Sequence, residues 1–182
     1  ADAVGVTNNG TVNFNSINVT QGTIEGTGTL GSAGSTIDVA ANGTIDQATL
    51  LGDTLTNAGT VIAGVLDVET SATNTGSMTL KDRLEGNVTN DGSLTLDGGQ
   101  ADFVYAQGTL TNNGTFVAKE TVSLEGGRFV QTSDTKAIFA DLDITAGGMT
   151  VNAGKVVEGE MLTVDMADSG DVAIDNDGTV DF

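Results

Sequence analysis

Asn57-Ala58-Gly59-Thr60 is the clearest copy of a short phrase that returns along this 182-residue chain. Each copy carries Asn, one further residue, Gly and then Thr or Ser, and an apolar residue follows. Asn and Gly tolerate the left-handed backbone of a tight turn, and Thr suits the start of a strand. The phrase therefore predicts a turn followed by a strand. The other full copies are Asn8-Asn9-Gly10-Thr11, Asn74-Thr75-Gly76-Ser77, Asn90-Asp91-Gly92-Ser93, Asn112-Asn113-Gly114-Thr115 and Asn176-Asp177-Gly178-Thr179.

The glycines of these copies and of weaker ones mark a period. Successive marks in the first half are 16 or 17 residues apart, at Gly10, Gly26, Gly43, Gly59, Gly76 and Gly92. Beyond them the marks spread to Gly114, Gly154 and Gly178, which predicts longer units. We therefore expect one domain over residues 1–182, with regular repeats in 8–100 and less regular repeats in 101–182.

Between the marks, short segments such as Ile37-Asp38-Val39 and Leu94-Thr95-Leu96 alternate apolar and polar residues. This period of two is typical of a strand with one buried face, and no stretch of eleven residues has helical periodicity. Short strands that turn at regular intervals suit a coil of stacked turns. The sequence thus predicts an all-β parallel β-helix (β-solenoid) of roughly ten short rungs, with Asn ladders at the corners and apolar columns inside.

Two alternatives to this fold remain at this point. Asn-Gly pairs favour type I′ hairpin turns, which would give an antiparallel barrel or sandwich. A chain with 26 Gly also suits intrinsic disorder, although the regular alternation of Val, Leu and Ile argues against it.

The charge excludes several classes of function. The chain has 25 acidic and 6 basic residues and a net charge of −19, which repels nucleic acid and anionic membrane surfaces. No apolar run reaches the ~20 residues that a membrane-spanning helix needs, so we expect no direct membrane insertion. His and Cys are absent, which removes the commonest general base and all thiolate chemistry.

The acidic C-terminal segment is the candidate metal site. Residues 165–181 contain no Lys or Arg, and carboxylate oxygens are the ligands that Ca²⁺ prefers. Asp175-Asn176-Asp177-Gly178 resembles part of an EF-hand loop, but Ala173 occupies the position of the first ligand. A solvated acidic face is the alternative interpretation. The candidate Ca²⁺ ligands are Asp165, Asp168, Asp171, Asp175 and Asp177.

Other patterns carry weaker indications. Gly26-x-Gly28-x-x-Gly31 matches a dinucleotide-binding fingerprint, but no helix is predicted after it. Asp141 with Asp143, and Glu158 with Glu160, have an i, i+2 spacing that glycoside chemistry exploits, although chance explains such pairs in an acidic chain.

Arrays of Thr-x-Thr raise the question of ice binding. A flat ice-binding face needs Thr-x-Thr at the same place in every turn. Counted from the glycine marks, Thr27-Gly28-Thr29, Thr54-Leu55-Thr56 and Thr109-Leu110-Thr111 fall at different points of the period. We therefore attribute them to ordinary strand propensity.

The phrase with its flanking strands, as in Leu55-Thr56-Asn57-Ala58-Gly59-Thr60-Val61, resembles the passenger region of bacterial autotransporter adhesins and filamentous haemagglutinin-like exoproteins. The resemblance covers nearly the whole chain. It implies a right-handed parallel β-helix, export through the outer membrane, and an extracellular or cell-surface location. Neither a signal peptide nor a translocating barrel is evident, so we expect a fragment of a longer polypeptide.

These observations together predict a non-enzymatic structural or adhesive module. Its expected partner is a host-surface protein, a glycan or a second copy of the chain. The alternative is a polysaccharide lyase or glycoside hydrolase on the same scaffold. We nominate no catalytic or cofactor-binding residue.

Overall fold

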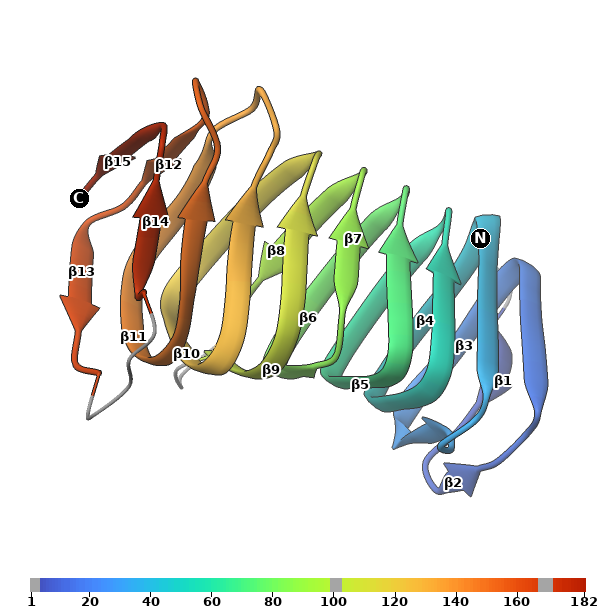
Figure 1. Ribbon diagram of the computed structural model, residues 1–182. Coiled ribbons are helices and arrows are strands. Elements are labelled where there is room, and N and C mark those ends of the chain that lie inside the picture. Colours follow the sequence, from blue (N-terminus) through green and yellow to red (C-terminus); the bar gives the residue numbers. More distant parts are fainter. Residues whose placement is uncertain (1–3, 99–102, 167–171) are drawn as a thin grey trace.

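A computed structural model describes residues 4–98, 103–166 and 172–182. The described residues form a 15-stranded sheet without a helix, and all strand pairs run parallel. The sheet winds into a β-solenoid of about 8 turns, with the two ends of the chain at opposite ends of the coil (Figure 1). The predicted fold is therefore confirmed, and the antiparallel and disordered alternatives are wrong. The strands are β1 (Val4–Thr7), β2 (Thr11–Val12), β3 (Ser16–Gly31), β4 (Thr36–Asn57), β5 (Thr60–Asn74), β6 (Ser77–Glu85), β7 (Val88–Asn90), β8 (Ser93–Leu96), β9 (Phe103–Asn112), β10 (Thr115–Gln131), β11 (Ala137–Val151), β12 (Val156–Glu158), β13 (Met161–Val164), β14 (Ile174–Asn176) and β15 (Thr179–Asp181).

The solenoid has three faces, because each turn contributes three segments that pair with the equivalent segments of the next turn. Long strands such as β4 pass round corners and belong to more than one face. Face A contains 16–19, 36–39, 54–57, 71–74, 88–90, 109–112, 128–131, 148–151 and 174–176. Face B contains 4–7, 23–26, 44–47, 60–63, 77–80, 93–96, 115–118, 137–139, 156–158 and 179–181. Face C contains 11–12, 29–31, 49–52, 65–68, 83–85, 103–107, 121–125, 141–144 and 161–164.

The turns of the coil differ in length. Buried side chains that stack at the corner between faces A and B are separated by 17, 16, 22 and 19 residues in sequence. The longest of these separations lies in the second half, as the spread of the glycine marks predicted, but 21 residues also separate the paired residues Thr23 and Thr44 near the N-terminal end. With ~4.8 Å between turns, the rod is about 40 Å long.

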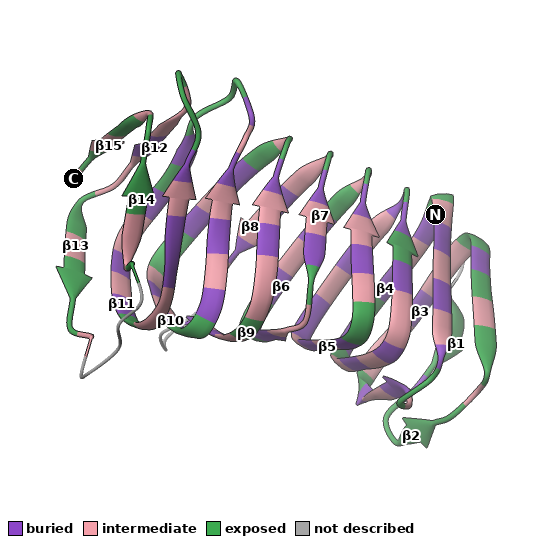
Figure 2. Ribbon diagram, viewed as in Figure 1, coloured by how far each residue is buried: buried purple, intermediate pink, exposed green. Residues whose placement is uncertain are grey.

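Apolar side chains stack inside the coil in columns. Buried and more exposed positions alternate along the strands (Figure 2). On face C, for example, Leu50, Leu66 and Leu84 lie above one another and are fully buried. Burial of one such side chain contributes roughly 2 kcal/mol, and each turn shields the apolar residues of its neighbours.

Aromatic side chains fill the interior of the longer turns. The rings of Phe116, Phe129 and Phe139 contact one another, with centroids 4.7 to 5.2 Å apart. Tyr105 is also buried and donates a hydrogen bond to the Gly86 carbonyl at 3.2 Å. A Cβ on Gly127 would overlap the Tyr105 ring, so this glycine makes room for the aromatic side chain.

A ladder of buried side-chain amides runs along the corner between faces A and B. Asn57 Nδ2 donates to Asn74 Oδ1 at 2.7 Å, and Asn74 Nδ2 donates in turn to Asn90 Oδ1 at 2.7 Å. The ladder continues through Asn112 to Gln131, at 2.8 Å for each step. Asn57, Asn74 and Asn90 also donate to a backbone carbonyl, such as Ser93 O at 2.9 Å from Asn74. The predicted Asn ladder is confirmed.

The corner glycines are required because the backbones of neighbouring turns approach each other closely at this corner. Gly59, Gly76, Gly92 and Gly114 stack, and a Cβ on any of the last three would lie under 3.0 Å from the carbonyl oxygen of the glycine in the previous turn. None of these four has a positive φ. The expectation that Gly serves a left-handed turn here is therefore wrong, since the stacking distance excludes a side chain.

The first two glycine marks belong to a different corner. A Cβ on Gly28 would overlap the Gly10 carbonyl, and Gly26 pairs with Gln47 at the end of face B. The Asn8 side chain donates to Gln47 Oε1 at 3.0 Å, between faces B and C. Gly10 and Gly26 therefore do not share a column with the later glycines. The regular spacing of the glycine marks along the sequence does not mean that all of them stack.

Replacing Asn74 by Ala tests the amide ladder. The change leaves Asn57 Nδ2, Asn90 Oδ1 and the Ser93 carbonyl without their present partner inside the fold. We expect a loss of about 3 kcal/mol in the free energy of unfolding, measured by urea denaturation. Thr73→Ala, on the outward side of the same strand, is the control and should change it by less than about 0.5 kcal/mol. Equal effects of the two changes would contradict a structural role of the ladder.

Two identical tetrapeptides, Asn-Asn-Gly-Thr at 8–11 and 112–115, test the stacked glycines. A Cβ on Gly114 would overlap the Gly92 carbonyl, whereas nothing lies within 4 Å of a Cβ on Gly10. We expect Gly114→Ala to lower the melting temperature by several degrees and Gly10→Ala to leave it nearly unchanged. A larger effect at Gly10 would show that the stacking assignment is wrong.

Candidate functional site

Outward-facing hydroxyl groups form continuous columns on two faces. They arise because strand alternation places a Thr or Ser next to an inward apolar residue at the same register in successive turns. On face B the hydroxyl residue follows a Gly, and on face A it precedes a buried Asn. The face B column contains Thr23, Thr44, Thr60, Ser77, Ser93 and Thr115, and the face A column contains Thr56, Thr73, Thr89 and Thr111. We call these two sets the hydroxyl columns.

The face A column corrects the interpretation of the Thr-x-Thr segments. Thr56 pairs with Thr73, Thr73 with Thr89 and Thr89 with Thr111. Thr54-Leu55-Thr56 and Thr109-Leu110-Thr111 therefore stand at the same place in the turn. The expectation that these two segments stand at different places in the turn is wrong. The turns are unequal in length, so counting residues from the glycine marks does not give the position within a turn. The column ends at Val130, which pairs with Thr111.

From Thr23 to Thr115 on face B, and from Thr56 to Thr111 on face A, no charged residue interrupts the hydroxyl columns, although the chain carries a net charge of −19. Each hydroxyl is both a donor and an acceptor, and the groups repeat at the ~4.8 Å spacing of the turns. Such a surface suits a partner that is itself extended and repetitive. This regular array was missed in the sequence because its register depends on the strand pairing.

Acidic groups gather instead on face C. Asp67 pairs in register with Glu85, and Arg83 Nε lies 2.6 Å from Glu85 Oε1. Burial raises the pKa of Asp67, Glu85 raises it further, and Arg83 partly offsets both effects. Asp67 also lines a small hollow of about 90 Å³ with Glu69. Burial likewise raises the pKa of Tyr105.

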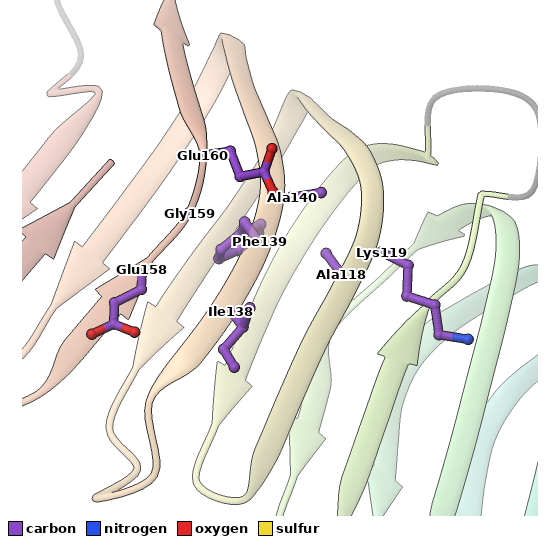
Figure 3. A pocket seen from close by; sticks show the side chains of 8 residues that line it. All are labelled: Ala118, Lys119, Ile138, Phe139, Ala140, Glu158, Gly159 and Glu160. Carbon is purple, nitrogen blue, oxygen red and sulfur yellow. The ribbon is translucent and has the colours of Figure 1, made fainter.

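An open hollow of about 460 Å³ lies across three successive turns near the C-terminal end (Figure 3). Lys119, Ile138, Glu158 and Glu160 are among its lining residues. Glu158 forms an ion pair with Lys136, and Lys119 Nζ lies 2.9 Å from Asp97 Oδ2. The carboxylates of Glu158 and Glu160 point away from each other in Figure 3. The carboxylates of Glu158 and Glu160 are therefore not directed at a common point, as two catalytic carboxylates would be.

The second predicted carboxylate pair, Asp141 and Asp143, lies on face C. The partners of Asp143 in the neighbouring turns are Ser123 and Thr163, which are not acids or bases. Asp143 Oδ1 is buried and has no hydrogen-bond partner in the structure. The pair therefore has a half-buried carboxylate, without an ionisable group at the same register on the adjacent strands.

The predicted calcium ligands are held by different faces. Asp165 N donates to the Ile144 carbonyl at the end of face C, whereas Asp175 pairs with Thr150 on face A. Asp177 follows β14 and is exposed, and Asp168 and Asp171 lie outside the described residues. Within the described ranges, no group of three or more acidic side chains could hold a metal ion.

The glycine fingerprint at residues 26–31 belongs to a strand of the solenoid. Gly26, Gly28 and Gly31 lie within β3, which pairs with β4 and is followed by no helix in the described part of the chain. The segment is therefore part of a solenoid turn and lacks the strand-turn-helix context of a dinucleotide-binding site.

Comparison with known protein families, curated proteins and solved structures found no match to this chain. Among the described residues, no helix is long and apolar enough to cross a membrane.

Asp67 makes stability depend on pH. Its pKa is raised in the folded protein, so the folded state binds this proton more tightly than the unfolded state does. The resulting stabilisation is present below the ordinary pKa of 3.8 and is lost as pH rises through the raised value. We expect Asp67→Asn to raise the melting temperature slightly at pH 7 and to have little effect at pH 3.

Asp46→Asn is the control for that experiment, because Asp46 is exposed on face B and its loss removes the same formal charge. A gain at pH 7 that is no larger for Asp67→Asn than for Asp46→Asn would contradict the role of burial.

Proposed function

We propose that this chain is a non-enzymatic structural and adhesive module, a rod displayed outside the cell. The proposed context is the passenger region of a bacterial autotransporter adhesin or a similar exoprotein. Its partner would be a glycan or protein on a host surface or matrix, or a second copy of the chain. The proposal rests on the fold together with the sequence resemblance to such passengers.

The observation that carries the proposal is the pair of hydroxyl columns. They lie on adjacent faces, on either side of the corner that the buried amide ladder fixes. Each column follows the stack of paired strands, so the backbone fixes the spacing of its hydroxyl groups. The side chains need no rearrangement to form the array. A preorganised array loses little entropy on binding, which favours adhesion to a repetitive surface by many weak contacts.

The alternative is a polysaccharide-degrading enzyme on the same scaffold. The hollow in Figure 3, with Glu158 and Glu160 at its edge, is the observation that favours it. The ion pair of Glu158 with Lys136 and the divergence of the two carboxylates argue against it.

Adhesion is tested by retention of the protein on insoluble cellulose, chitin and collagen. We expect binding to at least one of these probes, weakened roughly tenfold in the double variant Thr73→Glu, Thr89→Glu, since both carboxylates would have to lose water on contact. Thr121→Glu, on face C, is the matched control and should bind as the unmodified chain does. Absence of binding to all three probes, or equal loss in the control, would count against the hydroxyl columns.

Hydrolysis or elimination is tested by incubating the protein with neutral and acidic polysaccharides. We expect no new reducing or unsaturated ends in either series. If such ends form and disappear in Glu160→Gln, the enzymatic alternative replaces the adhesive one.

A further inference from the structure

Face A carries a second outward column beside its hydroxyl column, two residues earlier on each strand. Thr54 pairs with Ser71 in the next turn. Asn87 follows in the turn after that, because Ala72 N donates to the Asn87 carbonyl at 2.8 Å. Thr109 N in turn donates to Asn87 Oδ1 at 3.0 Å. The second column therefore runs through four turns, with the members Thr54, Ser71, Asn87 and Thr109.

The two columns together form a regular array of four rows in the middle of face A, which we call the face A array. Each row has an outward polar residue, a buried apolar residue and a second outward residue. No register shift interrupts the strand pairing between one row and the next. Figure 1 shows β7, which holds Thr89, among the stacked strands of this face. The rows are Thr54-Leu55-Thr56, Ser71-Ala72-Thr73, Asn87-Val88-Thr89 and Thr109-Leu110-Thr111.

The array is held rigidly from below. Each row is followed directly by an Asn of the buried amide ladder. Most outward members are Thr, whose branched Cβ restricts rotation about χ1. Such a surface loses little conformational entropy when a rigid partner packs against it. The central residues of the rows are no more than 1% exposed, and they are Leu55, Ala72, Val88 and Leu110.

Charged side chains stand at the two borders of the array and not within it. At one border, Arg128 pairs with Thr109. At the other, Thr54 Oγ1 lies 3.4 Å from Thr36 Oγ1, and Asp38 is the second outward residue of that strand. An ion keeps its hydration shell, so a surface of neutral hydroxyl and methyl groups suits an uncharged partner.

The spacing of the array resembles that of water molecules in ice. Neighbouring rows lie ~4.8 Å apart, and the two outward residues of one row lie ~6.7 Å apart. In ice the O–H···O bonds are about 2.75 Å long and the angles are tetrahedral, so second-neighbour oxygens lie about 4.5 Å apart. The same geometry gives a repeat of about 7.3 Å along the hexagonal axis. The mismatch between rows accumulates to about 1 Å over four rows, which small side-chain rotations absorb.

We infer that the face A array binds ice. Its hydroxyl groups take the places of water molecules at the crystal surface, and the threonine methyl groups lie between them. A crystal with protein bound to it grows only between the bound molecules, so its surface curves and its growth slows. The inference goes beyond the adhesive function proposed above, because ice is not one of the partners named there. The two share only the hydroxyl column of face A.

The test observes single ice crystals in solutions of the 182-residue chain and of two variants, Thr89→Tyr and Thr79→Tyr. Thr89 lies in the middle of the array. Thr79 is the matched control, because it also points outward between two buried residues, but on face B. Circular dichroism with melting curves checks that each variant folds. The readouts are the shape of the crystals and the difference between their melting and freezing temperatures.

We expect the unmodified chain and Thr79→Tyr to give faceted crystals and a temperature difference that grows with protein concentration. Thr89→Tyr should reduce this difference roughly tenfold, because a ring that stands above the neighbouring threonines keeps the other rows from the crystal.

Round crystals that melt and freeze at one temperature, at every protein concentration, would overturn the inference. An equal loss in Thr79→Tyr would also overturn it. The adhesive function keeps its own test, because retention on cellulose, chitin or collagen is measured without ice. Retention on those probes without an effect on ice would remove ice binding alone, and an effect on ice without retention would remove the adhesive proposal alone.

Discussion

The structure depends on one constraint, which is that equivalent residues of neighbouring turns lie directly above one another at the spacing of paired parallel strands. Backbone hydrogen bonds enforce this spacing, and every side-chain column follows from it. An apolar residue inside one turn is covered only by the equivalent residues of the turns on either side. A residue that breaks a column therefore affects two neighbours as well as itself.

The same constraint explains which polar residues are buried. Asn57, Asn74 and Asn90 lie inside the corner, where each amide satisfies the next and also bonds a backbone carbonyl. A single buried Asn would be costly, but a column of them leaves few unsatisfied groups. The stacking of equivalent residues also explains the corner glycines, because the backbone of one turn approaches that of the next too closely for a Cβ.

In the proposed function, binding and stability are divided between the two sides of each strand. The inward positions are occupied by Leu, Val, Ile and Phe, so their identity is fixed by packing. The outward positions are free to carry hydroxyl groups on faces A and B and acidic groups on face C, as with Thr89 and Asp67. The proposed binding surface arises from repetition, and no single residue dominates it.

The sequence by itself determined the class of fold. The repeated Asn-x-Gly-Thr phrase and the alternation in segments such as Leu94-Thr95-Leu96 are local signals, and they predicted short parallel strands, stacked amides and longer turns after Gly92. Only the tertiary structure decided the register. It moved Gly10 to another corner, aligned Thr56 with Thr111, and separated Asp165 from Asp175. These outcomes depend on how many residues each corner absorbs, and the spacing of glycines along the chain does not record that number.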